Sequence, residues 1–246
     1  MSHSGEPVDA PGGHAGRRTG RRELLLGAAF AALAVVGVPA VGLFAGGPRA
    51  AYARLQDAPL VGPVLEAWRA RVDEAALDDV EALAELLVPA AREADVEPAL
   101  LGAIVWAESR GRSGQRSSAG ALGLAQLVPA AARDAARRAG IEVPEDPAEL
   151  EERLLHDDRL NLRLGAVHLA WLLEHRGEWT LEAVLVSYNA GRARLFSWIE
   201  RHGSYEAWTE SELNRAAAGE RTTGALRYAR QVLGVRDRLA ARARLR

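Results

Sequence analysis

Apolar residues recur at helical spacing along most of the chain beyond residue 54. Over residues 77–92, for example, Val80, Leu83 and Leu87 fall three or four positions apart, as they would on one face of a helix. No window shows the sustained alternation of apolar and polar residues that marks a strand, and β-branched residues are few. The pattern therefore predicts an all-α domain.

Further helices are predicted where the same spacing is bounded by prolines, glycines or polar residues. Pro98 suits a first helical turn, and it opens a helix that carries Glu108 near its end. No internal repeat interrupts the pattern, so we expect one domain of ordinary size. The remaining predicted helices span residues 129–139, 147–155, 159–176, 181–188, 192–201 and 223–239.

The N-terminal part of the chain has a different pattern. Residues 1–22 are rich in Gly, Pro, His and Arg, whereas residues 24–47 contain no charged side chain and are long enough to span a hydrocarbon layer of ~30 Å. The positive flank precedes the apolar run, which predicts that the head stays in the cytoplasm and that the rest lies outside. We therefore expect residues 1–53 to be an export signal or a membrane anchor, followed by a helical lead-in over 54–84 and the main domain over 85–240.

Two features of this N-terminal part favour a cleaved signal. The segment 21–25 resembles a twin-arginine export motif, and Ala51-Tyr52-Ala53 offers a cleavage site. The apolar length favours an anchor that is retained, and a buried core helix fits less well because charged flanks would lie beside a core. In either of the first two cases the domain is exported across the inner membrane and is periplasmic or attached to the cell envelope, with residues 24–47 as its membrane contact if they are retained.

The composition limits the chemistry that the domain could use. A net charge of −2 gives no reason to expect a nucleic-acid partner. The absence of cysteine excludes disulfides, a thiolate nucleophile and a lipid-modified cysteine. No two of the 6 histidines have the H-x-x-x-H spacing, so no metal and no other cofactor is expected. Carboxylates, hydroxyls and amides remain as candidate functional groups.

Glu108 is the main candidate. It follows Leu101 and Ile104 at helical spacing, which directs its carboxyl toward the apolar side of the predicted helix. A carboxyl that is buried without a cationic partner has a raised pKa, so it keeps its proton near neutral pH and can act as a general acid. The alternative is that Glu108 faces solvent at the end of the helix, or pairs with Arg110 or Arg112.

Two further segments contain polar side chains among glycines. Residues 117–129 combine closely placed glycines with Gln126 and a helix-starting proline, which indicates either a loop that lines a ligand or a plain connection between helices. Residues 187–191 place an aromatic hydroxyl and an amide at a predicted helix end before a glycine. Taken by itself, the second segment is an ordinary helix end.

Together these segments resemble the lytic transglycosylases of the soluble (Slt) type, a family within the lysozyme-like superfamily. The order and spacing of five motifs fit the family over roughly residues 85–235. The motifs are Glu108-Ser109, Ser117-x-x-Gly120-Ala121-x-Gly123-Leu124-x-Gln126-x-x-Pro129, Asn161-x-x-x-Gly165, Ser187-Tyr188-Asn189-Ala190-Gly191 and Tyr228-x-x-x-Val232-Leu233.

The resemblance implies a lysozyme-like helical fold whose partner is peptidoglycan. It implies cleavage of the β-1,4 bond between N-acetylmuramic acid and N-acetylglucosamine with a 1,6-anhydro product, Glu108 acting first as acid and then as base. Ser117 and Gln126 would hold the sugar or orient the acid, and Tyr188 and Asn189 would bind the acetamido side. The substrate-binding set implied in this way is Ser117, Gly120, Gln126, Tyr188, Asn189 and Tyr228.

The chain departs from the family pattern at two positions. Ala125 stands where a methionine commonly precedes the motif glutamine, which predicts a larger subsite because a long side chain is replaced by a methyl group. Gly224 stands where an acidic residue usually lies four positions before the late tyrosine. Two other functions therefore stay open: a goose-type lysozyme-like hydrolase that admits water, and a non-catalytic wall-binding or secretion scaffold. The tryptophans are interpreted as core or rim residues and not as sugar-stacking platforms.

Overall fold

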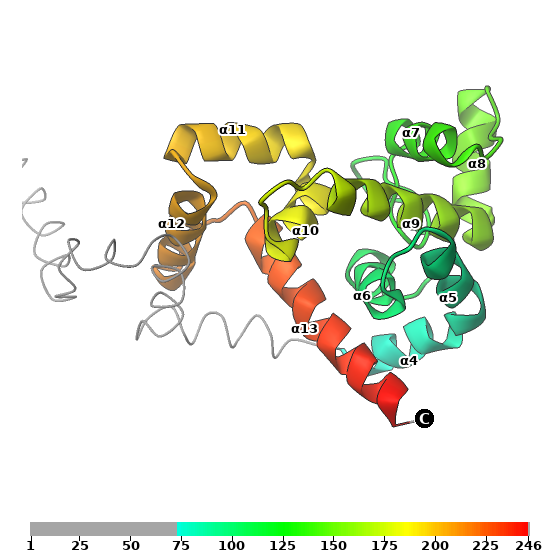
Figure 1. Cartoon of the computed structure of the whole chain (residues 1–246), viewed down its shortest axis with the longest axis horizontal. Coiled ribbons are helices and arrows are strands. Elements are labelled where there is room, and N and C mark those ends of the chain that lie inside the picture. The colour runs from blue at the N-terminus through cyan, green and yellow to red at the C-terminus, as the bar shows by residue number, and fades with distance from the viewer. Residues whose placement is uncertain (1–72, 246) are drawn as a thin grey trace, which may run out of the picture.

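The structure, a computed structural model, describes residues 73–245, which fold into helices joined by turns and loops (Figure 1). Two isolated bridges link Leu122 to Arg116 and to Leu127, and within this range no strand forms. The predicted all-α fold is confirmed. Residues 1–53, interpreted as signal or anchor, and most of the lead-in lie outside the described residues. Among the helices that are described, none is long and apolar enough to cross a membrane.

Helix α6 (Pro98–Ser109) lies at the centre of the fold and is apolar on nearly every side. All of residues 100–106 are buried, as suits a helix that is surrounded by other helices. The helix begins at the proline where the sequence predicted it. The indole Nε1 of Trp106 donates a hydrogen bond to the backbone oxygen of Asp73 at 3.2 Å, which ties α6 to the start of the described chain.

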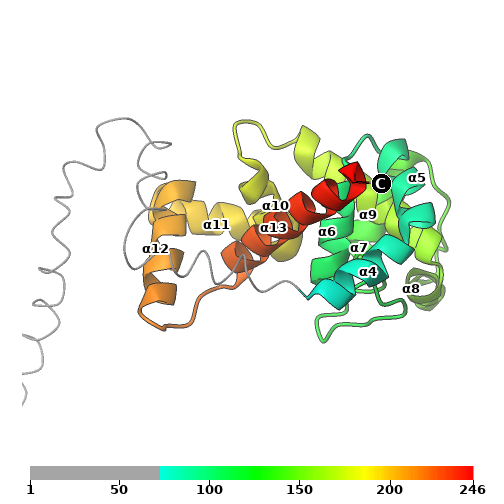
Figure 2. The ribbon, with the colours of Figure 1, turned by 90° about the horizontal axis from the view of Figure 1, so that it is seen from below.

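Four helices surround α6: α4 (Glu74–Ala82), α5 (Ala84–Glu93), α9 (Asp158–Glu174) and α13 (Ala225–Arg244). Its most extensive contact is with α13, the last helix, which crosses the fold and ends near α4 (Figures 1 and 2). Arg238 and Arg242 of α13 form ion pairs with Glu74 of α4. The two ends of the described chain are therefore held together.

The single helix predicted over residues 77–92 is in fact two helices. The chain turns at Leu83, which ends α4 and precedes α5, and its amide hydrogen-bonds to the oxygen of Val80 at 3.1 Å. The turn lets both helices pack on α6, whereas a single straight helix would run past it. Apolar spacing alone did not reveal the turn, because the helical spacing of apolar residues continues without a break from α4 into α5.

A second, smaller core lies on the other side of α9. It is built from α7 (Pro129–Ala139), α8 (Pro147–His156) and the loop residues Leu122 and Leu127. Helix α9 contributes Leu160 and Leu164 to this core, and its opposite face contributes to the main core around α6. Helix α9 is therefore a wall shared by both cores, and the glycine-rich loop lies against it.

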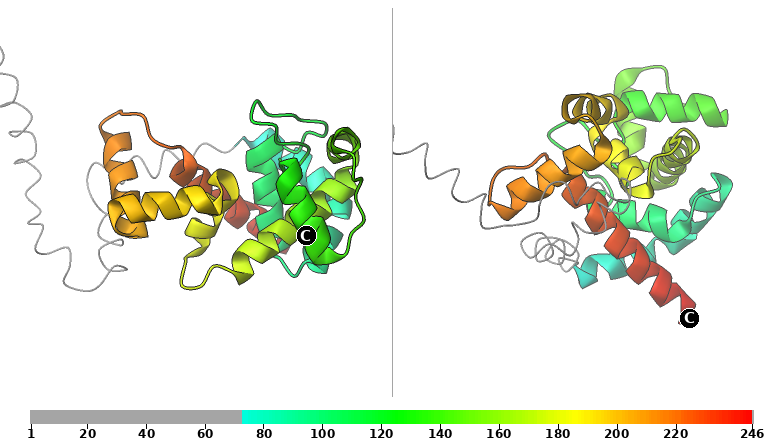
Figure 3. Two further views of the ribbon diagram at one scale, coloured as in Figure 1. Left: turned by 90° about the horizontal axis from the view of Figure 1, so that it is seen from above. Right: turned by 60° about the vertical axis from the view of Figure 1, so that its left-hand side comes forward.

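The helices α10 (Leu181–Ala190), α11 (Arg192–His202) and α12 (Tyr205–Ala217) form the remaining part, with α11 and α12 at the end of the molecule opposite α7 and α8 (Figure 3). Sequence analysis missed α12. Its buried face includes the polar residues Thr209 and Glu212 beside apolar ones, which obscures the apolar spacing. These polar groups are satisfied: Glu212, for example, accepts hydrogen bonds from the next loop.

Helices α10 and α13 are joined by a buried ion pair. Arg230 of α13 lies 2.9 Å from Glu182 of α10, and their side chains are 3% and 11% exposed. The hydroxyl of Tyr205 in α12 also donates to Glu182 at 3.0 Å. Because breaking a buried ion pair leaves an uncompensated charge, this network fixes α10 and α13 relative to one another.

Candidate active site

Asn161 of α9 holds the glycine-rich loop in place. Its fully buried side chain accepts a hydrogen bond from the amide of Ala125 at 2.8 Å and donates to the oxygens of Leu122 at 2.9 Å and Leu154 at 3.0 Å. Gly123 lies directly beneath with a φ of +73°, and a Cβ there would collide with the Asn161 amide. The motif that begins at Asn161 and the glycine-rich motif over residues 117–129 are thus in direct contact with each other.

A second close approach brings the loop onto α9 at Ala125. A Cβ added to Gly165 would lie 2.6 Å from the Cβ of Ala125, so helix and loop are nearly in backbone contact. Ala125 is completely buried and does not line the groove described below. The prediction that this alanine enlarges a subsite is therefore wrong, because its methyl group packs against the α9 backbone.

A groove of about 490 Å³ opens between the end of α6, this loop, α9 and α10. It brings together five of the side chains predicted for the site, although they are far apart in the sequence. Of its described lining residues, Glu108 is the only one that carries a carboxylate. The five predicted residues in its lining are Glu108, Ser117, Gln126, Tyr188 and Asn189.

Two other predicted residues do not line the groove. Gly120 lies in a turn in which its amide donates to the oxygen of Ser117 at 3.1 Å, and the residues on either side of it face the groove instead. Tyr228 comes from α13, and its hydroxyl is buried where it acts on Glu108. Gly120 therefore shapes the loop, and Tyr228 interacts with Glu108 without lining the groove.

The carboxyl of Glu108 has the electrostatics of a general acid. Burial raises its pKa to about 7, against the weaker opposing effect of the Tyr228 hydroxyl. Neither nearby arginine pairs with it: the Arg110 guanidinium lies over the Trp106 ring, 3.7 Å from its centroid, and Arg112 donates to the oxygen of Ser109. The alternative of an exposed or ion-paired Glu108 is thereby excluded.

The tyrosines around Glu108 remain protonated. Burial and the neighbouring Glu108 carboxyl raise the pKa of both Tyr188 and Tyr228 well above the ordinary value. Tyr188 donates its hydroxyl proton to the oxygen of Ala125 at 3.0 Å. The Tyr228 hydroxyl has no hydrogen bond of full geometry within the described part of the chain. The effect of Tyr228 on the site is its interaction with the Glu108 carboxyl, whose pKa it lowers.

The two polar side chains of the loop each keep one atom for a ligand. The Gln126 amide nitrogen donates to the oxygens of Gln115 at 3.0 Å and Gly123 at 2.8 Å, which leaves the amide oxygen. The Ser117 hydroxyl accepts from the amide of Ala121 at 3.0 Å and can still donate its proton. Each residue thus braces the loop with one atom and can present the other to the groove.

Sequence analysis missed three residues of the groove: His168, Trp171 and Arg192. His168 and Trp171 are three positions apart on α9 and so share one side of this helix, but no sequence signal shows that this side faces a groove. Arg192 follows the glycine that ends α10. No sequence pattern distinguishes it from the other arginines, because its placement depends on how α11 packs.

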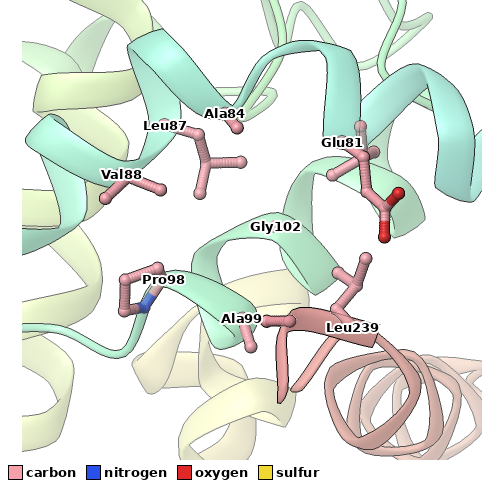
Figure 4. A pocket seen from close by; sticks show the side chains of 10 residues that line it. Glu81, Ala84, Leu87, Val88, Pro98, Ala99, Gly102 and Leu239 are labelled. Atoms are coloured by element: carbon pink, nitrogen blue, oxygen red, sulfur yellow. The ribbon is translucent and has the colours of Figure 1, made fainter. Parts of the chain in front are cut away.

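A second hollow lies between α4, α5, α6 and the end of α13. It measures about 260 Å³ and is lined by aliphatic side chains, and only Glu81 contributes a polar group (Figure 4). Leu87, Pro98 and Leu239 lie around it, none of which can act on a polar substrate. Of these two hollows, the groove at Glu108 is the one equipped for chemistry.

A helical fold built around one central helix, with a largely desolvated carboxyl that lines an open groove, fits the lysozyme-like class that the sequence resembles. The chain belongs to the family of the transglycosylase SLT domain, which matches residues 86–221. The Slt-type resemblance found in the sequence is confirmed.

Solved structures share the fold. An inactive mutant of the lytic transglycosylase Slt from Pseudomonas aeruginosa is similar over 79% of this chain and 30% of its own, with 24% identity and a TM-score of 0.56. The 70 kDa soluble lytic transglycosylase Slt70 from Escherichia coli is similar over 82% of this chain and 36% of its own, with 18% identity and a TM-score of 0.53. The chain thus spans about a third of the length of either protein.

Proposed function

We propose that this protein is a peptidoglycan lytic transglycosylase that cleaves the β-1,4 bond between N-acetylmuramic acid and N-acetylglucosamine. The observation that carries the proposal is Glu108, whose raised pKa leaves a large fraction protonated near neutral pH in a groove with no other carboxylate in its described lining. Membership of the transglycosylase SLT domain family supports the same activity.

In the first step, Glu108 donates its proton to the glycosidic oxygen, and the bond from this oxygen to C1 breaks. The acetamido oxygen of the muramic acid itself stabilises the positive charge that develops at C1. General acid catalysis of this kind contributes roughly 10² to 10⁴ in rate. Tyr188 and Asn189 line the groove and would bind the acetamido side.

In the second step, the Glu108 carboxylate removes the proton from the C6 hydroxyl of the same sugar. The O6 atom then forms its bond to C1, which yields the 1,6-anhydro end and returns the proton to Glu108. No water is consumed, and one carboxyl suffices for both steps. Two-carboxylate glycosidases instead hold a second acid roughly 5–9.5 Å away.

The experiment is mass spectrometry of purified peptidoglycan after digestion by the protein and by its Glu108→Gln variant. We expect anhydro-muropeptides from the unaltered protein and none from the variant. Glu178→Gln is the matched control, because Glu178 is exposed and does not line the groove. This control should leave the anhydro products unchanged.

Two other results would contradict the proposal. Products one water heavier, with reducing ends, would show a goose-type hydrolase that uses the same acid. Binding to the wall with intact glycan after digestion would show a non-catalytic scaffold. Each result identifies one of the alternatives that the sequence left open.

We also propose that the protein acts outside the inner membrane, either free in the periplasm or anchored to the envelope. The support is the uncharged run over residues 24–47 behind a positive flank. Fractionation of two fusions, one with and one without residues 1–53, tests this proposal. If both fusions stay in the cytoplasm, it is wrong.

A further inference from the structure

One wall of the groove gathers an arginine–tryptophan cluster, which consists of Arg138, Trp171 and Arg192. The Arg138 guanidinium lies 4.3 Å from the centroid of the Trp171 ring, and that of Arg192 lies 5.2 Å from it. Trp171 and Arg192 both line the groove with Glu108. Because two guanidinium groups lie over the Trp171 ring, the ring packs against these cations and its face is not free to stack on a sugar.

Arg192 is held in a defined orientation. It donates from one terminal nitrogen to the oxygen of His175 at 2.8 Å, and its guanidinium lies 5.3 Å from the Trp179 ring centroid and 5.5 Å from that of Phe196. No carboxylate among residues 73–245 forms an ion pair with it. Its other donors therefore remain available, and little side-chain entropy is lost when they bind a ligand.

The second arginine adds to the positive charge. Arg138 reaches Asp134 only at 4.0 Å, and Asp134 is closer to Arg137. The cluster therefore carries two guanidinium groups, and Asp134, at 4.0 Å from Arg138, is the one carboxylate among the described residues that pairs with either of them. The surrounding aromatic rings exclude part of the solvent, which strengthens the attraction of a guanidinium for an anion.

His168 connects the cluster to the residues around Glu108. Its ring lies 6.4 Å from Trp171 and 5.3 Å from Tyr188, centroid to centroid. Burial and Arg138 lower its pKa to about 4, so the imidazole is neutral and adds no positive charge. Its Nδ1 has no hydrogen-bond partner in the described structure. The positive charge on this wall thus comes from the two arginines.

We infer that the arginine–tryptophan cluster is a subsite for a carboxylate of the substrate. The inference rests on the proposed function, which makes peptidoglycan the substrate. Muramic acid differs from N-acetylglucosamine by a lactyl group, whose carboxyl is either free or linked to a peptide that has carboxylates of its own. The groove would thus prefer charged strands to neutral glycan, since arginine binds carboxylates through strong charge-assisted hydrogen bonds.

The test measures binding without turnover, using the full chain with Glu108→Gln. The ligands are glycan fragments of equal length: peptide-bearing strands, the same strands with amidated peptide carboxylates, peptide-free strands with the free lactyl carboxyl, and neutral chitooligosaccharides. We expect at least one carboxylate ligand to bind about tenfold more tightly than its neutral counterpart, with an affinity that falls as salt rises. Tight binding of the peptide-free strands identifies the lactyl group, and preference for peptide-bearing strands alone identifies the peptide.

Substitutions in the same background assign the effect to the cluster. Arg192→Gln should remove the roughly tenfold preference and most of the salt dependence, while the affinity for chitooligosaccharides stays the same. Arg192→Lys should retain part of the preference because it keeps the charge. Arg194→Gln is the matched control on the same helix, since Arg194 is exposed and does not line the groove.

Equal affinity for charged and neutral ligands, or an unchanged preference in Arg192→Gln, overturns the inference. The failure of the proposed function is distinguishable from this. A protein that prefers carboxylate ligands but forms no anhydro product has the subsite without the activity. A protein that forms anhydro products without any preference has the activity without the subsite. Failure to bind any of the glycans contradicts the subsite outright.

Discussion

At the scale of single residues, the molecule keeps Glu108 in an environment that is unfavourable to its charge. Burial raises the pKa of this carboxyl from 4.5 to about 7, so the folded protein binds a proton there that the unfolded chain has released. The cost to stability is absent below pH 4.5, grows as the pH rises, and is complete above about pH 7. The proposed catalysis and the stability of the fold thus make opposite demands on the same side chain.

Glu108→Gln should therefore stabilise the protein, and more so at high pH. A glutamine cannot ionise, so we expect a gain of about 3.5 kcal/mol at pH 8 and little change at pH 4, at about 1.4 kcal/mol per pKa unit. Urea unfolding at both pH values measures the difference. The same gain at both pH values would show that burial of the charge is not the cause.

Tyr228 lowers the pKa of Glu108, in opposition to burial. Tyr228→Phe should therefore raise the pKa of Glu108 and move the alkaline limb of kcat/KM upward from about pH 7. The pH profile of the variant, compared with that of the unaltered protein, measures this shift. A merely structural role for the tyrosine would lower the rate at every pH and leave the limb where it is.

At the scale of elements, the loop at residues 110–128 and helix α9 form one unit through Asn161. Asn161→Ala would leave the amide of Ala125 and the carbonyls of Leu122 and Leu154 without partners in a buried place. We expect a loss of about 3 kcal/mol in the free energy of unfolding, measured with urea. Asn214→Ala, an exposed change on α12, should alter it by less than about 0.5 kcal/mol. Similar losses for the two variants would contradict this account of Asn161.

Most helices and part of the site could be predicted from the sequence, because both depend on local signals. Prolines and apolar spacing located α6 and α7, and five predicted site residues do line one groove: Glu108, Ser117, Gln126, Tyr188 and Asn189. The buried methyl of Ala125 and the position of Arg192 depend on contacts between distant elements. No local pattern carries that information. The prediction for Ala125 was therefore wrong, and Arg192 was not predicted as a site residue.

At the scale of the whole molecule, the domain depends on a helix outside the residues that match the family. The match covers 86–221, whereas α13 begins at Ala225 and makes the most extensive contact with α6. A fragment of residues 86–221 should therefore lack a cooperative thermal transition, and a fragment of residues 73–245 should unfold in one step. Calorimetry compares the two. A cooperative transition in the shorter fragment would mean that α13 is an addition and not a part of the core.

The packing of α13 against α6 also has a consequence for the time at which the site around Glu108 is complete. Glu108 is synthesised well before Tyr228, and a ribosome that adds ~5–20 residues per second needs on the order of ten seconds to make the chain between them. Until this helix packs on α6, the carboxyl of Glu108 lacks its neighbour Tyr228. Under the proposed function, the site at Glu108 is therefore completed only when the last helix of the described chain has been made and has packed on α6.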